Sequence, residues 1–151
     1  MNYRVTDLIL RGMTGNNTVL GGGGFHHVAI RARDFDATVK FYTTGLGFQE
    51  KISWGEGNSR AVMLDTGDGN YLEVFAGGSA EPKPEGSILH FALRTTDCDG
   101  ALKQAVAAGA VLTMEPKSLE IASRPGPTPV RIAFCKGLDG EVIEFFQNEL
   151  T

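Results

Sequence analysis

Two segments of this chain repeat the same pattern. The fourteen residues that begin at His27 match the fourteen that begin at His90, 63 positions later, and six of the aligned residues are identical. A second match joins residues 68–75 to residues 139–146, 71 positions later. Internal similarity of this kind indicates two copies of one structural unit, which can cover each other's apolar surface within one chain or between chains. The two offsets differ by eight, which predicts an insertion in the Pro-rich stretch 115–129 of the second copy.

Each copy predicts a strand, then a helix, then two or three strands. An aspartate, Asp34 or Asp97, follows each first strand and can cap a helix of about ten residues. The expected strands are 25–31, 47–54, 59–65 and 70–76 in the first copy, and 88–95, 110–114, 130–135 and 141–147 in the second. We therefore expect an α+β fold of two tandem βαβββ modules, about 25–80 and 86–148, which form a cupped mixed sheet with helices on its outer face.

The residues before the repeat have a different character. Residues 1–24 contain one short apolar cluster and end in four consecutive glycines, and glycine-rich segments are flexible linkers. We expect a flexible N-terminal arm at 1–24, ahead of a single domain at 25–151. The apolar cluster is too short for a secretion signal, which favours a cytoplasmic protein.

Charge and hydropathy exclude two classes of partner. The net charge is −4 and no basic block stands out, so we expect no nucleic-acid binding. No run of 18 apolar residues is present, so we expect no membrane span. The remaining expectation is a small-molecule substrate. A homodimer is also expected, because half-sheets leave edges that pair readily.

Four ionisable residues are predicted to lie on the sheet faces that the helices leave uncovered. Side chains alternate along a strand, so each of these residues points away from its aliphatic neighbours. A buried carboxylate is costly without a partner, and a divalent cation accepts imidazole and carboxylate together. Taken singly, each residue could be an ordinary polar group. The repeat-equivalent set of four predicts a metal site: His27, Glu73, His90 and Glu144.

The motifs around these residues resemble the vicinal oxygen chelate superfamily, which includes glyoxalase I, extradiol dioxygenases and the bleomycin and fosfomycin resistance proteins. The resemblance rests on three motifs: His27-Val-Ala-Ile with Gly45-Leu-Gly-Phe, the strand at His90, and Gly140-Glu-Val-Ile-Glu144. The resemblance covers residues 25–147. It implies paired βαβββ modules around a metal, with His26 as the runner-up to His27 as a ligand.

The ligand set most resembles that of glyoxalase I, in which two histidines and two glutamates hold zinc or nickel. The resemblance implies one divalent ion per site, with manganese, cobalt and iron as alternatives to those two. It also implies a lyase or isomerase that acts on a small oxygen-chelating substrate through a metal-stabilised enediolate. Glu144 would be the base and Glu73 its partner in moving the proton. The alternatives are a drug-sequestering binding protein and an Fe(II) extradiol-type dioxygenase.

Eight further residues are candidates for binding the substrate. Arg31 and Arg94 share the faces of the histidines and could hold a carboxylate through two hydrogen bonds. The other candidates are aromatic residues of the same faces and residues of flanking loops, including a candidate lid at 118–129: Tyr71, Phe75, Phe146, Trp54, Arg60 and Arg124.

Overall fold

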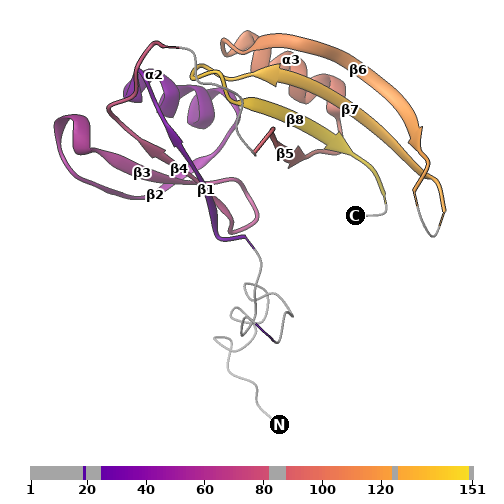
Figure 1. Ribbon diagram of the computed structural model, residues 1–151, viewed down its shortest axis with the longest axis horizontal. Helices are drawn as coiled ribbons and strands as arrows, with labels where there is room; N and C mark the ends of the chain where they lie inside the picture. The colour runs from indigo at the N-terminus through magenta and orange to yellow at the C-terminus, as the bar shows by residue number, and fades with distance from the viewer. Residues whose placement is uncertain (1–18, 20–24, 82–87, 124–125, 150–151) are drawn as a thin grey trace.

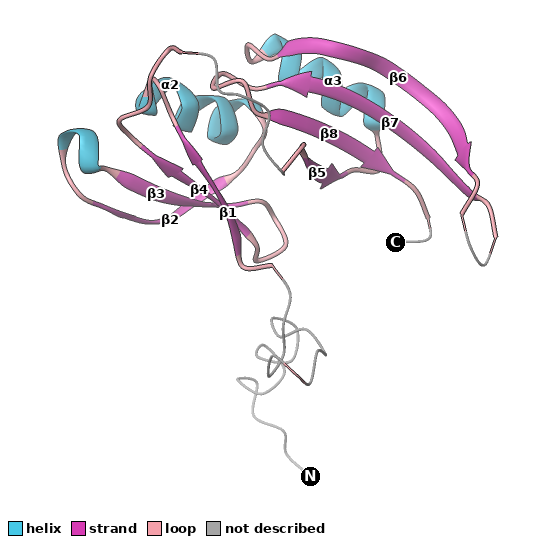
Figure 2. Cartoon of the chain, viewed as in Figure 1, coloured by secondary structure: helices cyan, strands magenta, loops and turns pink. Residues whose placement is uncertain are grey.

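The computed structural model describes residues 19, 25–81, 88–123 and 126–149 (Figure 1). The predicted arm lies outside these residues except for Val19, and Arg124 lies outside them too. Two four-stranded mixed sheets form the protein, each covered on one face by helix (Figure 2). This confirms the α+β fold of two βαβββ modules. Among the described residues, no helix has the length and apolar character that crossing a membrane requires.

The first module follows the predicted order of elements. They are β1 (His27–Arg31), α2 (Phe35–Lys40), η1 (Phe41–Gly45), β2 (Gln49–Trp54), η2 (Gly57–Ser59), β3 (Ala61–Asp65) and β4 (Tyr71–Phe75). The strand order is β1-β4-β3-β2, and β1 runs parallel to β4 while the other pairs are antiparallel. The first strand, β1, therefore lies at one edge of the sheet, and the last strand, β4, lies next to it.

The second module repeats this topology. Its elements are β5 (Phe91–Arg94), α3 (Cys98–Ala107), β6 (Val111–Ile121), β7 (Thr128–Lys136) and β8 (Val142–Gln147). The strand order is β5-β8-β7-β6, again with the first and last strands parallel. Strand β5 begins at Phe91, so His90 lies just before the strand in which it was expected.

The two aspartates begin the helices as the sequence predicts. The side chain of Asp34 accepts from the backbone N–H of Ala37, and that of Asp97 from the N–H of Gly100, both at 3.0 Å. These bonds satisfy backbone donors that the first helical turn leaves free. The first helix then changes to a π-helical turn, η1, that ends at Gly45.

The insertion forms a long hairpin, and our expectation of a lid loop at 118–129 is largely wrong. Strand β6 continues to Ile121 and pairs with β7, which begins at Thr128. Prolines are tolerated here because Pro116 is in an edge strand, and Pro129 precedes the first residue that pairs with β8. The end of the hairpin is therefore a two-stranded ribbon that extends past β8 (Figure 1).

One hydrophobic core is shared by the two modules. Buried residues from both sheets and both helical segments form a single cluster, which includes Tyr42, Leu64, Leu102 and Ile143. Gly45 allows the helical segments to approach, because a Cβ at this position would lie only 2.5 Å from that of Ala108. The modules thus meet through their helix-covered sides, and the opposite face of each sheet stays open.

Two acidic side chains of the β7–β8 turn fasten the modules to each other. Asp139 accepts from the backbone N–H of Arg33 and from the hydroxyl of Thr38, both at 2.6 Å. Glu141 accepts from the hydroxyl of the fully buried Tyr42. We call these four side chains, Thr38, Tyr42, Asp139 and Glu141, the inter-module clasp.

The Glu141 carboxyl gives the clasp a pH dependence. Burial raises its pKa above the ordinary 4.5, against the lowering effect of the bond from Tyr42. The folded protein therefore holds this proton more tightly than the unfolded chain does. The stability that this provides is present below about pH 4.5 and is lost as the pH rises through the pKa of the folded state. The glutamine of Glu141→Gln cannot titrate. We therefore expect the free energy of unfolding of this variant, relative to that of the wild type, to be higher at about pH 7 than at about pH 4.

Urea unfolding of both proteins at the two pH values measures this. A difference between variant and wild type that is the same at both pH values would contradict the prediction.

Candidate metal centre

The first histidine and glutamate of the predicted set lie side by side on the open face of the first sheet. Strands β1 and β4 are adjacent and parallel, and Ala29 is the register partner of Glu73. The His27 Nε2 atom lies 3.4 Å from Oε2 of Glu73. The glutamate side chain is 10% exposed, whereas that of the histidine is 40% exposed. A nearly buried carboxylate thus faces a reachable imidazole nitrogen.

The second module builds the same pair. Strands β5 and β8 place Ala92 opposite Glu144, and the Nε2 atom of His90 lies 3.0 Å from Oε2 of Glu144. The side-chain exposures, 39% and 10%, repeat those of the first pair. Burial raises the pKa of Glu144, and His90 opposes this rise. The raised pKa makes this carboxylate a better proton acceptor than an exposed glutamate.

The spacing of the donor atoms in both pairs fits a divalent ion. Nitrogen and oxygen ligands bind such ions at about 2.0–2.2 Å. At bond angles between about 90° and 109°, two such ligands are about 2.8–3.6 Å apart. The observed separations of 3.0 and 3.4 Å lie in this range.

The structure assembles two separate pairs within one chain. Over the ranges that the structure describes, no three side chains of His, Cys, Asp or Glu come close enough together to hold a metal ion. His27 meets Glu73 and His90 meets Glu144, each on its own sheet. Because the modules pack through their helices, the two open faces present their pairs outward rather than to each other.

Apolar side chains surround each pair on its open face. In the first module, Met63 is the register partner of Glu73 and Ile52 is that of Met63. The rings of Trp54 and Phe75 are nearly perpendicular, with 6.4 Å between their centroids. In the second, Phe134 is opposite Glu144, Ile132 is opposite Phe146, and the Phe134 ring meets that of His90 at 5.5 Å. Ile52 and Trp54 remain 57% and 42% exposed, so this lining is accessible from solvent.

The predicted substrate-binding residues divide into two groups. Those on the open faces are Arg31, Arg94, Tyr71, Phe75, Phe146 and Trp54. Arg31 donates to the carbonyl of Ala76 at 2.9 Å, with its guanidinium 5.5 Å from the centre of the Phe75 ring. Arg60 instead pairs with Asp36 at 3.0 Å and lies over the ring of Phe35, on the helix side of the sheet.

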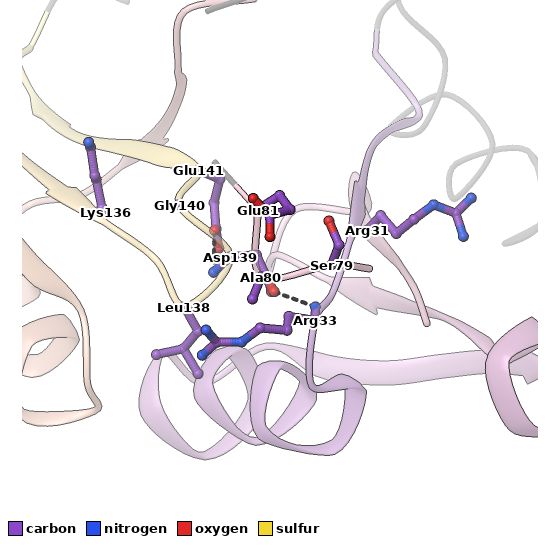
Figure 3. A pocket seen from close by; sticks show the side chains of 10 residues that line it. All are labelled: Arg31, Arg33, Ser79, Ala80, Glu81, Lys136, Leu138, Asp139, Gly140 and Glu141. Atoms are coloured by element: carbon purple, nitrogen blue, oxygen red, sulfur yellow. Dashed lines mark hydrogen bonds between the residues drawn. The ribbon is translucent and has the colours of Figure 1, made fainter. Parts of the chain in front are cut away.

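A depression of about 400 Å³ lies at the junction of the modules, away from both His–Glu pairs. It is lined by residues that follow β1 and β4 and by the β7–β8 turn, including Arg33, Ser79 and Asp139 (Figure 3). The guanidinium of Arg31, which also borders it, points away from the other labelled side chains (Figure 3). The charged groups here do not converge on a common point, and Asp139 is already bonded within the clasp.

Sequence reasoning missed two kinds of residue. It did not predict a role for Asp139, because nothing in the sequence shows that the β7–β8 turn reaches the other module. It treated His26 only as an alternative to His27, although the Nδ1 atoms of these neighbours lie 2.9 Å apart. The adjacency of two histidines was the available signal.

Known proteins resemble this chain over most of its length. The family model described as "Glyoxalase/Bleomycin resistance protein/Dioxygenase superfamily" matches residues 24–145. The uncharacterized protein YwbC of Bacillus subtilis is 33% identical over 126 residues, which cover 81% of this chain and 95% of that protein. A probable lactoylglutathione lyase of Vibrio cholerae is 30% identical over 129 residues, covering 82% and 89%.

The fold is also found in solved structures. One is a mutant of the fosfomycin resistance protein FosX from Listeria monocytogenes, complexed with Mn(II) and a dihydroxypropylphosphonic acid. It superposes with a TM-score of 0.64 at 15% identity, and the match covers 85% of this chain and 92% of that one. At this identity the likeness concerns the fold.

Proposed function

Because the chain belongs to the glyoxalase/bleomycin resistance protein/dioxygenase superfamily, we propose that it is a metal-dependent lyase or isomerase of the glyoxalase type. The observation that carries this proposal is the pair of His–Glu contacts at repeat-equivalent positions, with donor separations that suit one divalent ion. The similarity to a probable lactoylglutathione lyase supports the same class of reaction.

The four ligands would come together between two copies of the chain. Each open face carries half of the set, His27 with Glu73 or His90 with Glu144. In a twofold-symmetric dimer, a contact between the first module of one copy and the second of the other occurs twice. Such a dimer holds two four-ligand sites. The exposed apolar side chains around each pair would become the walls of a closed cup.

The residues of the cup suit proton transfer next to a carbonyl. When bound, a divalent ion, zinc or nickel in our proposal, polarises the substrate carbonyl and stabilises negative charge on its oxygen. Glu144 would remove the proton from the neighbouring carbon and return it, because it is a largely buried carboxylate beside His90 in the cup. Glu73 occupies the equivalent place in the other half and takes part in moving the proton.

Arginines on the open faces indicate the substrate's chemistry. Arg31 is held by the Ala76 carbonyl and by Phe75, so its position is defined before a ligand arrives. Arg94 is exposed on the equivalent face of the second module. We propose that the substrate is a small molecule with two neighbouring oxygens for the metal and a carboxylate for these arginines.

Metal content and turnover together test the proposed function. We expect the purified protein to take up about one divalent ion per chain, and Glu73→Gln to weaken this because an amide is a poorer ligand than a carboxylate. We expect Glu144→Gln to lose about 10²–10⁴-fold in turnover of the methylglyoxal–glutathione adduct, because it removes the proton acceptor. Plasma mass spectrometry and an absorbance assay measure the two effects.

Glu120→Gln is the matched control, because Glu120 is an exposed carboxylate of β6. It should leave metal content and turnover unchanged. A wild type that takes up no zinc, nickel, manganese, cobalt or iron(II) would contradict the proposal. The fold would then serve as a binding cup for a small ligand.

A further inference from the structure

The two metal-site histidines differ in the residue that precedes them. His26 precedes His27, whereas Leu89 precedes His90 at the equivalent place in the repeat. The Nδ1 atoms of His26 and His27 lie 2.9 Å apart, within hydrogen-bonding distance. The His26 ring also packs against that of Tyr71, with 5.1 Å between centroids. The leucine of the second module has no group that could make the same bond.

The hydrogen bond between the rings leaves a choice of proton position. A neutral imidazole carries one proton, so one Nδ1 atom donates and the other accepts. An imidazole protonated at Nε2 can donate that N–H to water or to Glu73, and a hydrogen bond to Glu73 would bring the Nε2 atom within about 3.2 Å of the carboxylate. Its distance from Oε2 of Glu73 is 3.4 Å, which is longer. The geometry therefore favours His27 with its proton on Nδ1, donated to His26.

We propose that His26 is a positioning residue, which accepts the Nδ1–H of His27 and so turns the lone pair of Nε2 toward Glu73. Two acceptor atoms then face each other, which is the arrangement that a divalent cation requires. Metal-ligating histidines usually donate their second ring N–H to a neighbouring group, and loss of that group costs about 10–100-fold in affinity. The role in metal binding rests on the proposed function, whereas the hydrogen bond itself does not.

The contact with Tyr71 explains how an exposed histidine can keep this orientation. Tyr71 is the first residue of β4, and its backbone N–H donates to the carbonyl of His26 at 2.8 Å. The main chain and the ring of His26 are thus both held by the same residue. In the second module, His90 lies 3.0 Å from its glutamate, so its Nε2 atom is within hydrogen-bonding distance of that carboxylate.

Three variants separate this role from a structural one. His26→Phe keeps a ring against Tyr71 but removes the acceptor, and we expect zinc binding to weaken about 10–100-fold. His26→Gln keeps an acceptor oxygen and should recover most of the loss. Leu89→Phe makes a similar change before the other histidine and should leave zinc binding unchanged. Competition with a chromogenic chelator measures the dissociation constants.

Nitrogen-15 NMR of the metal-free protein tests the hydrogen bond directly. The spectra are recorded at about pH 8. We expect His27, assigned by its absence in His27→Gln, to be protonated at Nδ1 in the wild type and to lose this preference in His26→Phe. Protonation at Nε2 in the wild type, or wild-type zinc affinity in His26→Phe, would overturn the proposal. If the wild type binds no zinc, the proposed function fails, and the NMR result still decides the role of His26.

Discussion

Mixing two variants that each lack half of the ligand set should restore metal binding. His27→Ala removes the first pair and His90→Ala removes the second, so each protein alone should bind zinc weakly or not at all. In a mixed dimer, the intact first pair of one chain faces the intact second pair of the other. One of its two sites is then complete, because the modules meet across the subunit interface in our proposal.

The expected recovery has a defined size. Random exchange of equal amounts of the two variants makes about half of the dimers mixed, and each carries one complete site of two. Zinc content should therefore rise from near zero to about one quarter of the wild-type value. Equilibrium dialysis after subunit exchange in dilute urea measures this value.

Two control mixtures make the result decisive. His27→Ala with Glu73→Ala, both in the first pair, should give no recovery, because no mixed dimer then has an intact first pair. Wild type treated in the same way should keep its full zinc content. Failure of the His27→Ala and His90→Ala mixture to bind zinc, with mixed dimers shown by native mass spectrometry, would contradict a site shared between subunits.

Removing the Asp139 side chain should destabilise the protein far more than the same change at its repeat equivalent, Asp68. Asp139→Ala leaves the N–H of Arg33 and the hydroxyl of the 1% exposed Thr38 without their acceptor. Hydrogen bonds to charged groups contribute about 1.5–3 kcal/mol each. We therefore expect a loss of about 3 kcal/mol in the free energy of unfolding, measured by urea denaturation.

Asp68 serves as the control because it makes its bonds within its own turn. It accepts from the hydroxyl of Thr66 at 2.8 Å and from the N–H of Asn70 at 3.1 Å. These groups are exposed and can bond to water instead, so Asp68→Ala should cost about 1 kcal/mol or less. Equal losses for the two variants would show that the clasp adds nothing beyond a local turn.

The sequence predicted those parts of the fold that depend on local patterns. The repeat gave the order of elements, Asp34 and Asp97 marked the helix starts, and strand alternation placed Glu73 and Glu144 on the open faces. These features follow from neighbours a few residues apart, which one sequence can show.

What the sequence did not predict depends on contacts between distant segments. The bonds of Asp139 join residues about a hundred positions apart, and no local pattern distinguishes this aspartate from Asp68. Strand β6 is longer than expected because pairing with β7 overrides the weak strand propensity of a Pro-containing stretch. The division of the four ligands into two pairs depends on how the modules pack, which the repeat itself leaves open.

Joining the two modules in one chain has a consequence for symmetry. A dimer of identical half-chains would make every contact between its halves twice, and any change in one turn would appear in both. In the continuous chain the two Asp-Gly turns are free to differ. Asp68 accepts hydrogen bonds from residues of its own turn, whereas Asp139 accepts them from Arg33 and Thr38 of the other module. Covalent linkage thus allows the turn at Asp139 to bond between the modules, while the repeat-equivalent turn at Asp68 bonds within itself.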